Sequence, residues 1–384
     1  MSDNPSLIPV APLLPSGPLP TVSKSQDKKK KLTDKYIGLR NQGSTCYLNS
    51  LIQSLFMTPE FRANILKWTY DINFHGLPED CIPFQLQKLF SRLQVPIRDA
   101  EETVGLTRSF QWSSNEVYVQ QDIQELCRVL FEAIQISLGE QEANFINDLY
   151  SGESHSVVKC LECNTCSINK DFFLDLTLPI LNIFENIHNK SLDMALMNFI
   201  KPEKLEEDNK YQCEKCNKKV NALKYLKFEK LPQLLFIQLG RFYYDYQTDM
   251  RQKIHDKVPF PLILNMNKYK KDYDTLTYNV DESENEKFCL DDSEEVIAKY
   301  KKEGENVYEL YSVVVQSGSA NGGHYYAYIK SFADMPKRFA DMPKRACLKL
   351  LQGRNPPKGR ANPACRTTLL TYRLFSAGFK SIFP

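Results

Sequence analysis

The chain has 384 residues, 42% of them apolar and 25% charged, which are the proportions of a soluble globular protein with enough apolar residues for a large core. Its formal net charge of +2 speaks against nucleic acid or a membrane surface as the main partner. No apolar run approaches the roughly 18 residues of a membrane-spanning helix. Prolines interrupt the apolar residues near the N-terminus, so we do not expect a signal peptide.

The N-terminal segment, residues 1–35, is rich in Pro, Ser and Lys and has no apolar periodicity. It is predicted to be a disordered arm. The arm ends in a lysine run at 28–31. This run fits a solvated tether, a nuclear signal or an anion-binding patch.

Helices are predicted for the first half of the globular part. Apolar residues recur at helical spacing over 48–56, so a helix should begin at or just after Cys46 and end near Pro59. The segment 60–150 has a mostly helical pattern, and Asp122 should open another helix within it.

Strands are predicted for the second half. The short apolar runs at 234–237, 313–315 and 325–329 fit buried strands. Helices first and strands later indicate an α+β fold. The acidic and polar stretch 281–306 fits a surface insertion.

The last 52 residues, 333–384, differ from the rest in composition. They hold eleven Lys and Arg against two Asp, a net charge of +9, and the sequence Phe-Ala-Asp-Met-Pro-Lys-Arg occurs twice in tandem at 332–338 and 339–345. We expect this tail to lie outside the fold. It is either a basic tail that binds a partner or a sequence without evolved structure.

Cys46 is the candidate nucleophile. A thiol at a helix N-terminus lies at the positive end of the helix dipole, which favours the thiolate. Gly43 permits a tight turn before it, and the Asn41 amide is placed to donate to a developing oxyanion. The alternative is that Cys46 is a small buried apolar residue.

His324 is the candidate base among five histidines. Two glycines precede it, which lets another backbone approach closely, and a predicted strand follows it, which would hold the ring on a rigid element. A thiol nucleophile needs such an imidazole, which is expected to be remote in sequence. The alternative is a structural histidine beside a Gly-rich turn.

Four segments together resemble motifs of the ubiquitin-specific proteases, which are papain-like cysteine peptidases, and they occur in the family's order over residues 36–330. Gly38 to Gln53 fits every fixed position of the family's Cys box, and Gly322–Tyr328 fits its His box. The segments between them are Gln120–Leu126, which is similar to the family's Q-Q-D-x-x-E-[FL], and Leu231–Phe242, which is similar to its L-P-x-x-L…L-x-R-F strand.

The resemblance implies a fold of thumb, palm and fingers, with a helical thumb, an antiparallel β palm and fingers that carry zinc knuckles. The boundaries that we assign are an arm at 1–35, a catalytic domain at 36–332 (thumb about 36–150, fingers about 151–230, palm about 231–332) and the tail at 333–384.

The resemblance also implies residue roles and a substrate. The substrate would be the C-terminal tail of ubiquitin, which ends in two glycines. Asn41 would help form the oxyanion hole. Gln121, Asp122 and Tyr325 would contact the tail, and the charge of Asp122 suits the tail's arginines.

Two Cys-x-x-Cys pairs, Cys160/Cys163 and Cys213/Cys216, predict a structural zinc site of four thiolates. Each pair alone is a weak signal, but two together are a strong one. The alternative is four free thiols. Cys166 also follows Cys163 at the same spacing, so it is a second candidate for one ligand position.

The chain departs from the family where a third catalytic residue is expected. No W-x-x-F-[DN]-D pattern follows His324, and both tryptophans come earlier. Asp341 lies near the expected distance, but it belongs to the repeated heptapeptide. A missing third residue would leave the imidazole poorly oriented. We therefore expect a palm that is cut short or replaced from about residue 331.

The sequence thus favours a thiol-dependent deubiquitinase that cleaves after the C-terminal glycine of ubiquitin, works as a monomer and needs no nucleic acid or membrane partner. Eleven cysteines without a secretory signal place it in the cytoplasm or the nucleus. The rival from another class is a ubiquitin-binding protein with impaired catalysis. A zinc-ribbon nucleic-acid binder is a third reading, which the near-neutral charge disfavours.

Overall fold

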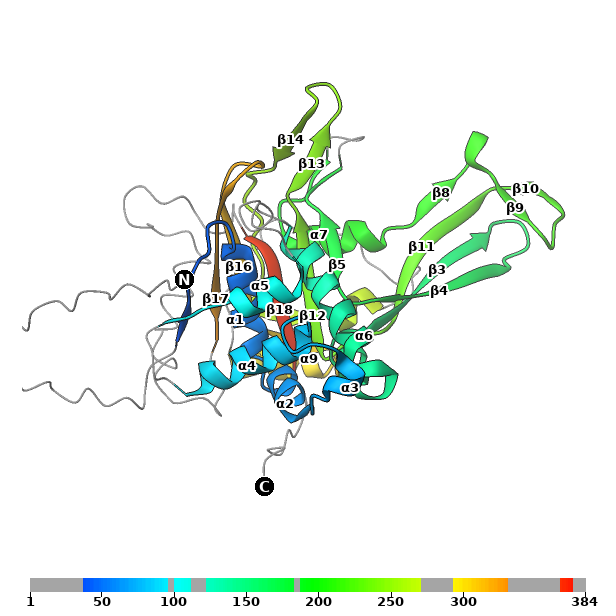
Figure 1. Ribbon diagram of the computed structural model, residues 1–384. Helices are drawn as coiled ribbons and strands as arrows, with labels where there is room; N and C mark the ends of the chain where they lie inside the picture. The colour runs from blue at the N-terminus through cyan, green and yellow to red at the C-terminus, as the bar shows by residue number, and fades with distance from the viewer. Residues whose placement is uncertain are drawn as a thin grey trace, which may run out of the picture. The chain divides into compact units, whose positions relative to one another are not determined.

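The helices of the first half form one layer of the molecule, the thumb (Figure 1). The computed structural model describes residues 37–95, 100–111, 122–182, 187–270, 293–330 and 367–375. Within these ranges the thumb helices are α1 (Cys46–Phe56), α2 (Pro59–Lys67), α3 (Ile72–His75), α4 (Ile82–Gln94), α5 (Val104–Ser109) and α6 (Ile123–Tyr150). A short parallel pair, β1 (Gly38–Leu39) and β2 (Ala100–Glu101), borders this layer.

Two helix starts that the sequence predicts are confirmed. Helix α1 begins at Cys46. Helix α6 follows Asp122, whose side chain accepts a hydrogen bond from the Gln124 backbone N–H at 2.8 Å and so caps the helix. Gly139 interrupts α6 with a φ of 72°, which glycine adopts without strain.

A six-stranded sheet forms the palm. Its main path runs in the order β15-β16-β18-β12-β5, and β17 also pairs with β16. The strands are β5 (Leu176–Pro179), β12 (Leu234–Gly240), β15 (Ile263–Asn265), β16 (Val307–Gly318), β17 (Gly323–Ile329) and β18 (Thr367–Leu374). The predicted runs at 234–237, 313–315 and 325–329 all lie in these strands. The expectation of an antiparallel palm is wrong for one pair, because β12 and β5 run parallel.

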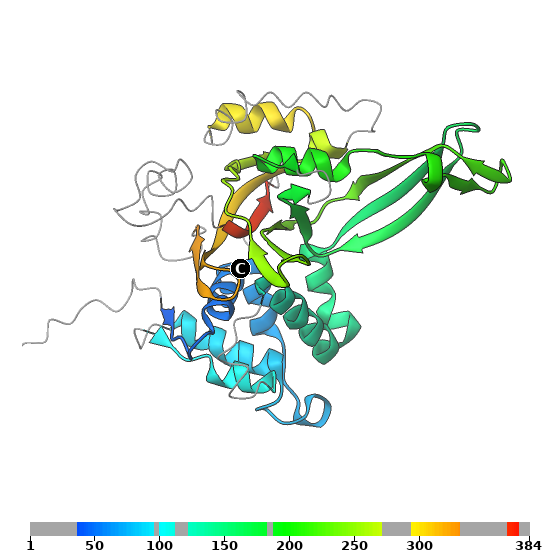
Figure 2. The same cartoon turned by 90° about the horizontal axis from the view of Figure 1, so that it is seen from above.

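The palm sheet separates two apolar cores. Because side chains alternate across a strand, Leu234 and Phe236 of β12 face the core shared with the thumb helices. Leu235 and Ile237 face a second core that contains helix α7 (Leu192–Ile200). Figure 2 shows the palm strands between the thumb helices and α7. The sheet is therefore buried on both faces, which makes it a rigid support.

Strand β18 differs from what the sequence predicts. The expectation that residues 333–384 lie outside the fold does not hold for 367–375. Strand β18 lies between β12 and β16 and pairs antiparallel with both. Leu370 and Tyr372 are fully buried. Thr and Tyr favour a pleated, half-buried strand, and the partner strands β12 and β16 come from distant parts of the chain. The basic, Pro- and Gly-rich sequence around the strand gives no sign of these partners.

The fingers extend from the palm as a second sheet (Figure 1). Its strands, in spatial order, are β4 (Cys166–Phe173), β3 (Gly152–Cys160), β11 (Ala222–Lys230) and β8 (Glu203–Leu205). A separate pair, β9 (Tyr211–Cys213) and β10 (Lys218–Val220), lies near the far end of β3 and β11.

The other elements lie outside these two sheets. They are β6 (Leu181–Asn182), β7 (Ile187–His188), β13 (Phe242–Asp245), β14 (Met250–Lys253), α9 (Glu294–Lys301) and two 3-10 turns, η3 (Glu207–Asn209) and η4 (Asn267–Lys270). Helix α9 lies in the predicted acidic insertion, and none of its residues is buried. No helix among the described residues is long and apolar enough to cross a membrane.

Several sequence expectations fall outside the described residues. They concern the arm at 1–35, Gln121, the acidic residues 281–292, the heptapeptide repeats and Asp341.

Candidate active site

A network of side chains shapes the loop before Cys46. The Asn41 side-chain oxygen, Oδ1, accepts hydrogen bonds from the Thr45 backbone N–H and hydroxyl, both at 3.0 Å. The Asn41 amide donates to the Gly43 carbonyl at 3.0 Å. Gly43 has a φ of 120°, a conformation that favours glycine. The predicted tight turn is thus held by its own side chains, and Asn41 retains a second amide N–H.

Cys46 opens helix α1 at the wall of a cavity of about 460 Å³. Cys46 is 6% exposed. The Tyr325 backbone N–H donates to the Cys46 Sγ at 3.3 Å. Asn41, His324 and Tyr325 line the same cavity. The structure therefore brings together candidate residues from two segments almost 280 positions apart in the sequence.

His324 lies at the start of strand β17. It pairs with Ser317 across the β16–β17 hairpin. Its side chain is exposed, and its ring stacks on the ring of Tyr326 with centroids 6.2 Å apart. Among the described residues, no carboxylate or amide side chain hydrogen-bonds the His324 ring. The sheet and Tyr326 hold the ring, and Asp341 lies outside the described ranges.

Asp122 lies close to this site. It forms an ion pair with Arg251 of strand β14 at 3.7 Å and accepts a hydrogen bond from the Gln238 side chain at 3.4 Å. The Arg251 guanidinium also lies 5.0 Å from the centre of the Phe242 ring. Burial raises the pKa of Tyr325, and the charge of Asp122 raises it further. Asp122 therefore acts electrostatically on a residue of the cavity wall.

Tyr47 is buried beside the nucleophile. Burial, and secondly the charge of Cys46, raise its pKa to about 12. Its ring packs edge-on against that of Tyr325, with centroids 6.3 Å apart. The phenol therefore stays neutral at physiological pH.

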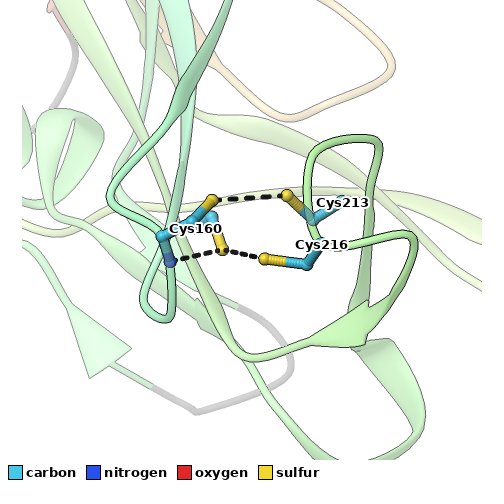
Figure 3. A group of neighbouring side chains, drawn as sticks. Cys160, Cys213 and Cys216 are labelled. Atoms are coloured by element: carbon cyan, nitrogen blue, oxygen red, sulfur yellow. Dashed lines mark hydrogen bonds between the residues drawn. The ribbon is translucent and has the colours of Figure 1, made fainter.

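Four cysteines gather at the tip of the fingers. The sulfur atoms of Cys160, Cys163, Cys213 and Cys216 all lie within 4.8 Å of one another. The Cys160–Cys216 and Cys163–Cys213 sulfur atoms are 3.9 and 3.7 Å apart. Figure 3 shows Cys213 and Cys216 facing Cys160 across the gap between two turns. Cys166 is exposed and lies outside this group.

The model of the family described as ubiquitin carboxyl-terminal hydrolase matches residues 37–336. The chain belongs to this family. The match covers the thumb, the fingers and the palm up to the end of β17, and it does not include β18. The fold is thus the mixed α+β fold that the sequence motifs predict.

Curated relatives in the ubiquitin carboxyl-terminal hydrolase family are substantially longer than this chain. Ubiquitin carboxyl-terminal hydrolase 47 from Drosophila melanogaster is 41% identical over 337 residues, which are 77% of this chain and 22% of the relative. The protein of the same name from Homo sapiens is 41% identical over 328 residues, 78% of this chain and 24% of the relative. Human ubiquitin carboxyl-terminal hydrolase 40 is 36% identical over 334 residues, which are 81% of this chain and 24% of the relative. The chain spans about a quarter of their length.

A solved structure shares the fold. It is the SAGA Ubp8/Sgf11/Sus1/Sgf73 DUB module bound to ubiquitin aldehyde, with a TM-score of 0.64 and 24% identity. The match covers 89% of this chain and 70% of that one.

Sequence reasoning missed two cationic residues of this family member. Arg251 contacts Asp122, and Lys253 contacts the hairpin that carries His324. Both lie in strand β14, far along the chain from the residues that they touch. No spacing or motif in the sequence signals these contacts, because they arise when the β13–β14 hairpin packs against the start of helix α6 and against the β16–β17 hairpin.

Proposed function

We propose that the chain is a thiol-dependent deubiquitinase that hydrolyses the peptide or isopeptide bond after the C-terminal glycine of ubiquitin. One observation carries the proposal. Cys46 and His324 line a single cavity, and the backbone N–H that follows His324 hydrogen-bonds the Cys46 sulfur. Membership of the ubiquitin carboxyl-terminal hydrolase family supports the substrate.

The reaction has two halves. The Cys46 thiolate attacks the glycine carbonyl carbon, and the Asn41 amide donates to the oxyanion that forms. His324, protonated, gives its proton to the departing amine, so a thioester and a free amine result. Water then attacks the thioester while His324 removes its proton, and the carboxylate leaves as Cys46 is regenerated.

The substrate tail is proposed to reach Cys46 along the wall formed by Tyr325, past Asp122. The Asp122 side chain is 19% exposed, so its carboxylate is accessible to an arginine of the tail. An arginine and a carboxylate form strong, directional hydrogen bonds.

A ubiquitin probe with a C-terminal electrophile tests the proposal. We expect the probe to label the 384-residue protein once, at Cys46, and to leave Cys46→Ala unlabelled. Equal labelling of both proteins, or none of the wild type, would overturn the assignment.

A ubiquitin-binding protein with impaired catalysis is the second candidate. It is favoured because, among the described residues, no carboxylate or amide side chain hydrogen-bonds the His324 ring. Binding of ubiquitin without release of a fluorophore from a ubiquitin-amide reporter would support this candidate. Turnover of the reporter that His324→Ala abolishes would exclude it.

We further propose that the four finger cysteines bind a structural zinc ion. A tetrahedron with Zn–S bonds of about 2.3 Å has edges of about 3.8 Å. The Cys163–Cys213 and Cys160–Cys216 sulfur atoms are 3.7 and 3.9 Å apart. A closed set of four thiolates would leave no open coordination position, so the ion would hold two turns together without entering the reaction.

A further inference from the structure

We propose that Lys253 is a positioning residue for His324, which it serves by fixing the end of the β16–β17 hairpin. This inference rests on the proposed function, because it assigns Lys253 a role in the reaction that His324 performs. Lys253 ends strand β14, and the hairpin lies beside that strand in Figure 1.

The hairpin end is tightly built. Gly318 pairs with Gly323, one position beyond the Ser317–His324 pair. Gly318 has a φ of 134°, and a Cβ there would lie 2.5 Å from the Gly322 carbonyl oxygen. A Cβ on Gly323 would lie 2.6 Å from the Gln316 side-chain nitrogen. The turn therefore has one compact arrangement, and a shift of its β16 side would move His324.

The Lys253 ammonium contacts the β16 side of this turn. It donates to the carbonyl oxygens of Gln316 at 2.8 Å and Gly318 at 3.2 Å, and also to the Gln316 side-chain oxygen. These acceptors flank Ser317, the residue paired with His324. An ammonium has three N–H donors, and these three oxygens can take all of them.

Burial makes these contacts energetically important. Lys253 is 9% exposed and Gln316 is 1% exposed. A buried ammonium is costly unless it is hydrogen-bonded, so the three oxygens are held in place around it. The Gln316 amide in turn donates to the Ser319 carbonyl at 3.0 Å, which extends the network into the loop of the hairpin.

Lys253 is itself held on a rigid base. The Ile254 N–H donates to the Arg241 carbonyl at 2.7 Å, and the fully buried Arg241 guanidinium donates to the carbonyls of Ile254 and Asp256 at 3.2 and 2.9 Å. A side chain on a fixed strand can hold a neighbouring element in one geometry. Among the described residues no side chain hydrogen-bonds the His324 ring, so the position of the ring depends on its stacking with Tyr326 and on the backbone that Lys253 fixes.

The test compares Lys253→Met with Lys257→Met in the 384-residue protein. Methionine keeps most of the apolar stem and removes the ammonium, and Lys257 is an exposed lysine four residues later. We expect Lys253→Met to lower kcat on ubiquitin–aminomethylcoumarin at least about tenfold, since small misplacements of catalytic groups have effects of this size. KM should change less than about twofold, because ground-state binding is not altered.

A second readout does not depend on turnover. The rate of Cys46 alkylation by iodoacetamide at pH 7, followed by peptide mass spectrometry, reports the thiolate that His324 supports. The alkylation rate of Lys253→Met should fall toward that of His324→Ala, whereas the rate of Lys257→Met should match that of the wild type. A purely structural lysine would lower the melting temperature without this loss of Cys46 reactivity.

Unchanged kcat and unchanged alkylation in Lys253→Met would overturn the inference, as would a change in KM alone. If Lys253→Met does not fold, Gln316→Leu decides, because it removes one acceptor and keeps the two backbone acceptors. Gln316→Leu should lower kcat and the rate of Cys46 alkylation, by less than Lys253→Met is expected to. Failure of the wild type to react with the ubiquitin probe would instead overturn the proposed function.

Discussion

Residues of the nucleophile segment have structural tasks besides their proposed chemistry. The Asn49 amide of helix α1 donates to the Arg40 carbonyl at 3.1 Å, and the Gln53 amide donates to the Ile37 carbonyl at 2.9 Å. These bonds fasten the incoming strand to the helix that presents Cys46. The segment fits its motif at so many positions because the loop, the helix and the thiol depend on one another.

At the scale of single residues, Arg251 provides a testable prediction. It neutralises Asp122, so under the proposed function it competes with the arginines of the ubiquitin tail. Arg251→Ala should lower KM for ubiquitin substrates by about two- to fivefold, the range expected for a pair that is partly exposed to solvent. The exposed Arg92→Ala on helix α4 serves as the control. Steady-state kinetics check it, and a higher KM would mean that Arg251 itself contributes to ubiquitin binding.

At the scale of elements, β18 is the strand that joins the two halves of the palm. It supplies partners for β12 on one side and β16 on the other. Its Arg373 also forms an ion pair with Glu60 of helix α2, so it connects the sheet to the thumb. Without it, two long apolar strands would have unpaired edges, which favour aggregation.

Leu370→Ala tests the place of β18. Leu370 is fully buried, and removing a buried leucine side chain costs about 2–5 kcal/mol of unfolding free energy. Leu374→Ala, at a half-buried position of the same strand, should cost less. Urea unfolding measures both. Equal, small losses would show that the strand does not lie in the sheet in solution.

The fingers allow a matched test of the cysteines. Cys160→Ser should abolish binding of one zinc per chain and lower thermal stability, because a structural site needs all four ligands. Cys166→Ser should retain the metal, because Cys166 lies outside the sulfur cluster. Zinc content by atomic emission and thermal melting are the measurements. Loss of zinc in Cys166→Ser would mean that Cys166 is a ligand.

Features that depend on residues close together in the sequence could be predicted, and features that depend on distant residues could not. Helix α1 was predictable because its apolar residues recur every three to four positions, and the four cysteines were predictable because ligand spacing is local. Strand β18 was not predictable, because its eight residues lie within a basic tail and their partners are more than 50 residues away in the sequence. The Lys253 and Arg251 contacts are likewise set by tertiary packing, which no local pattern encodes.

For the whole molecule, buried phenols on both sides of the palm predict how stability depends on pH. Burial is the leading cause of raised pKa values for Tyr47, which reaches about 12, and for Tyr150, Tyr269, Tyr308, Tyr311 and Tyr325. The folded state holds these protons more tightly than the unfolded state, whose tyrosines ionise near pH 10. Their contribution to stability is therefore complete below about pH 10 and is lost as the pH rises toward about 12.

Urea unfolding at pH 8, 10 and 11, together with tyrosinate absorbance at 295 nm, measures this loss. Exposed tyrosines should ionise first, and the buried group should follow only as the far-ultraviolet circular dichroism signal is lost. Ionisation of all tyrosines near pH 10 with the fold intact would contradict the expected burial.

The position of β18 also sets an order of events during synthesis. Both of its neighbours, β12 and β16, leave the ribosome well before residues 367–374 exist. During that interval the palm has an open seam, and closing it requires contacts that are distant along the chain, which form slowly. Chaperones that shield strand edges would have most to do at this stage. Any transcript or protease product that ends after β17 would lack β18, so the edges of β12 and β16 would stay unpaired.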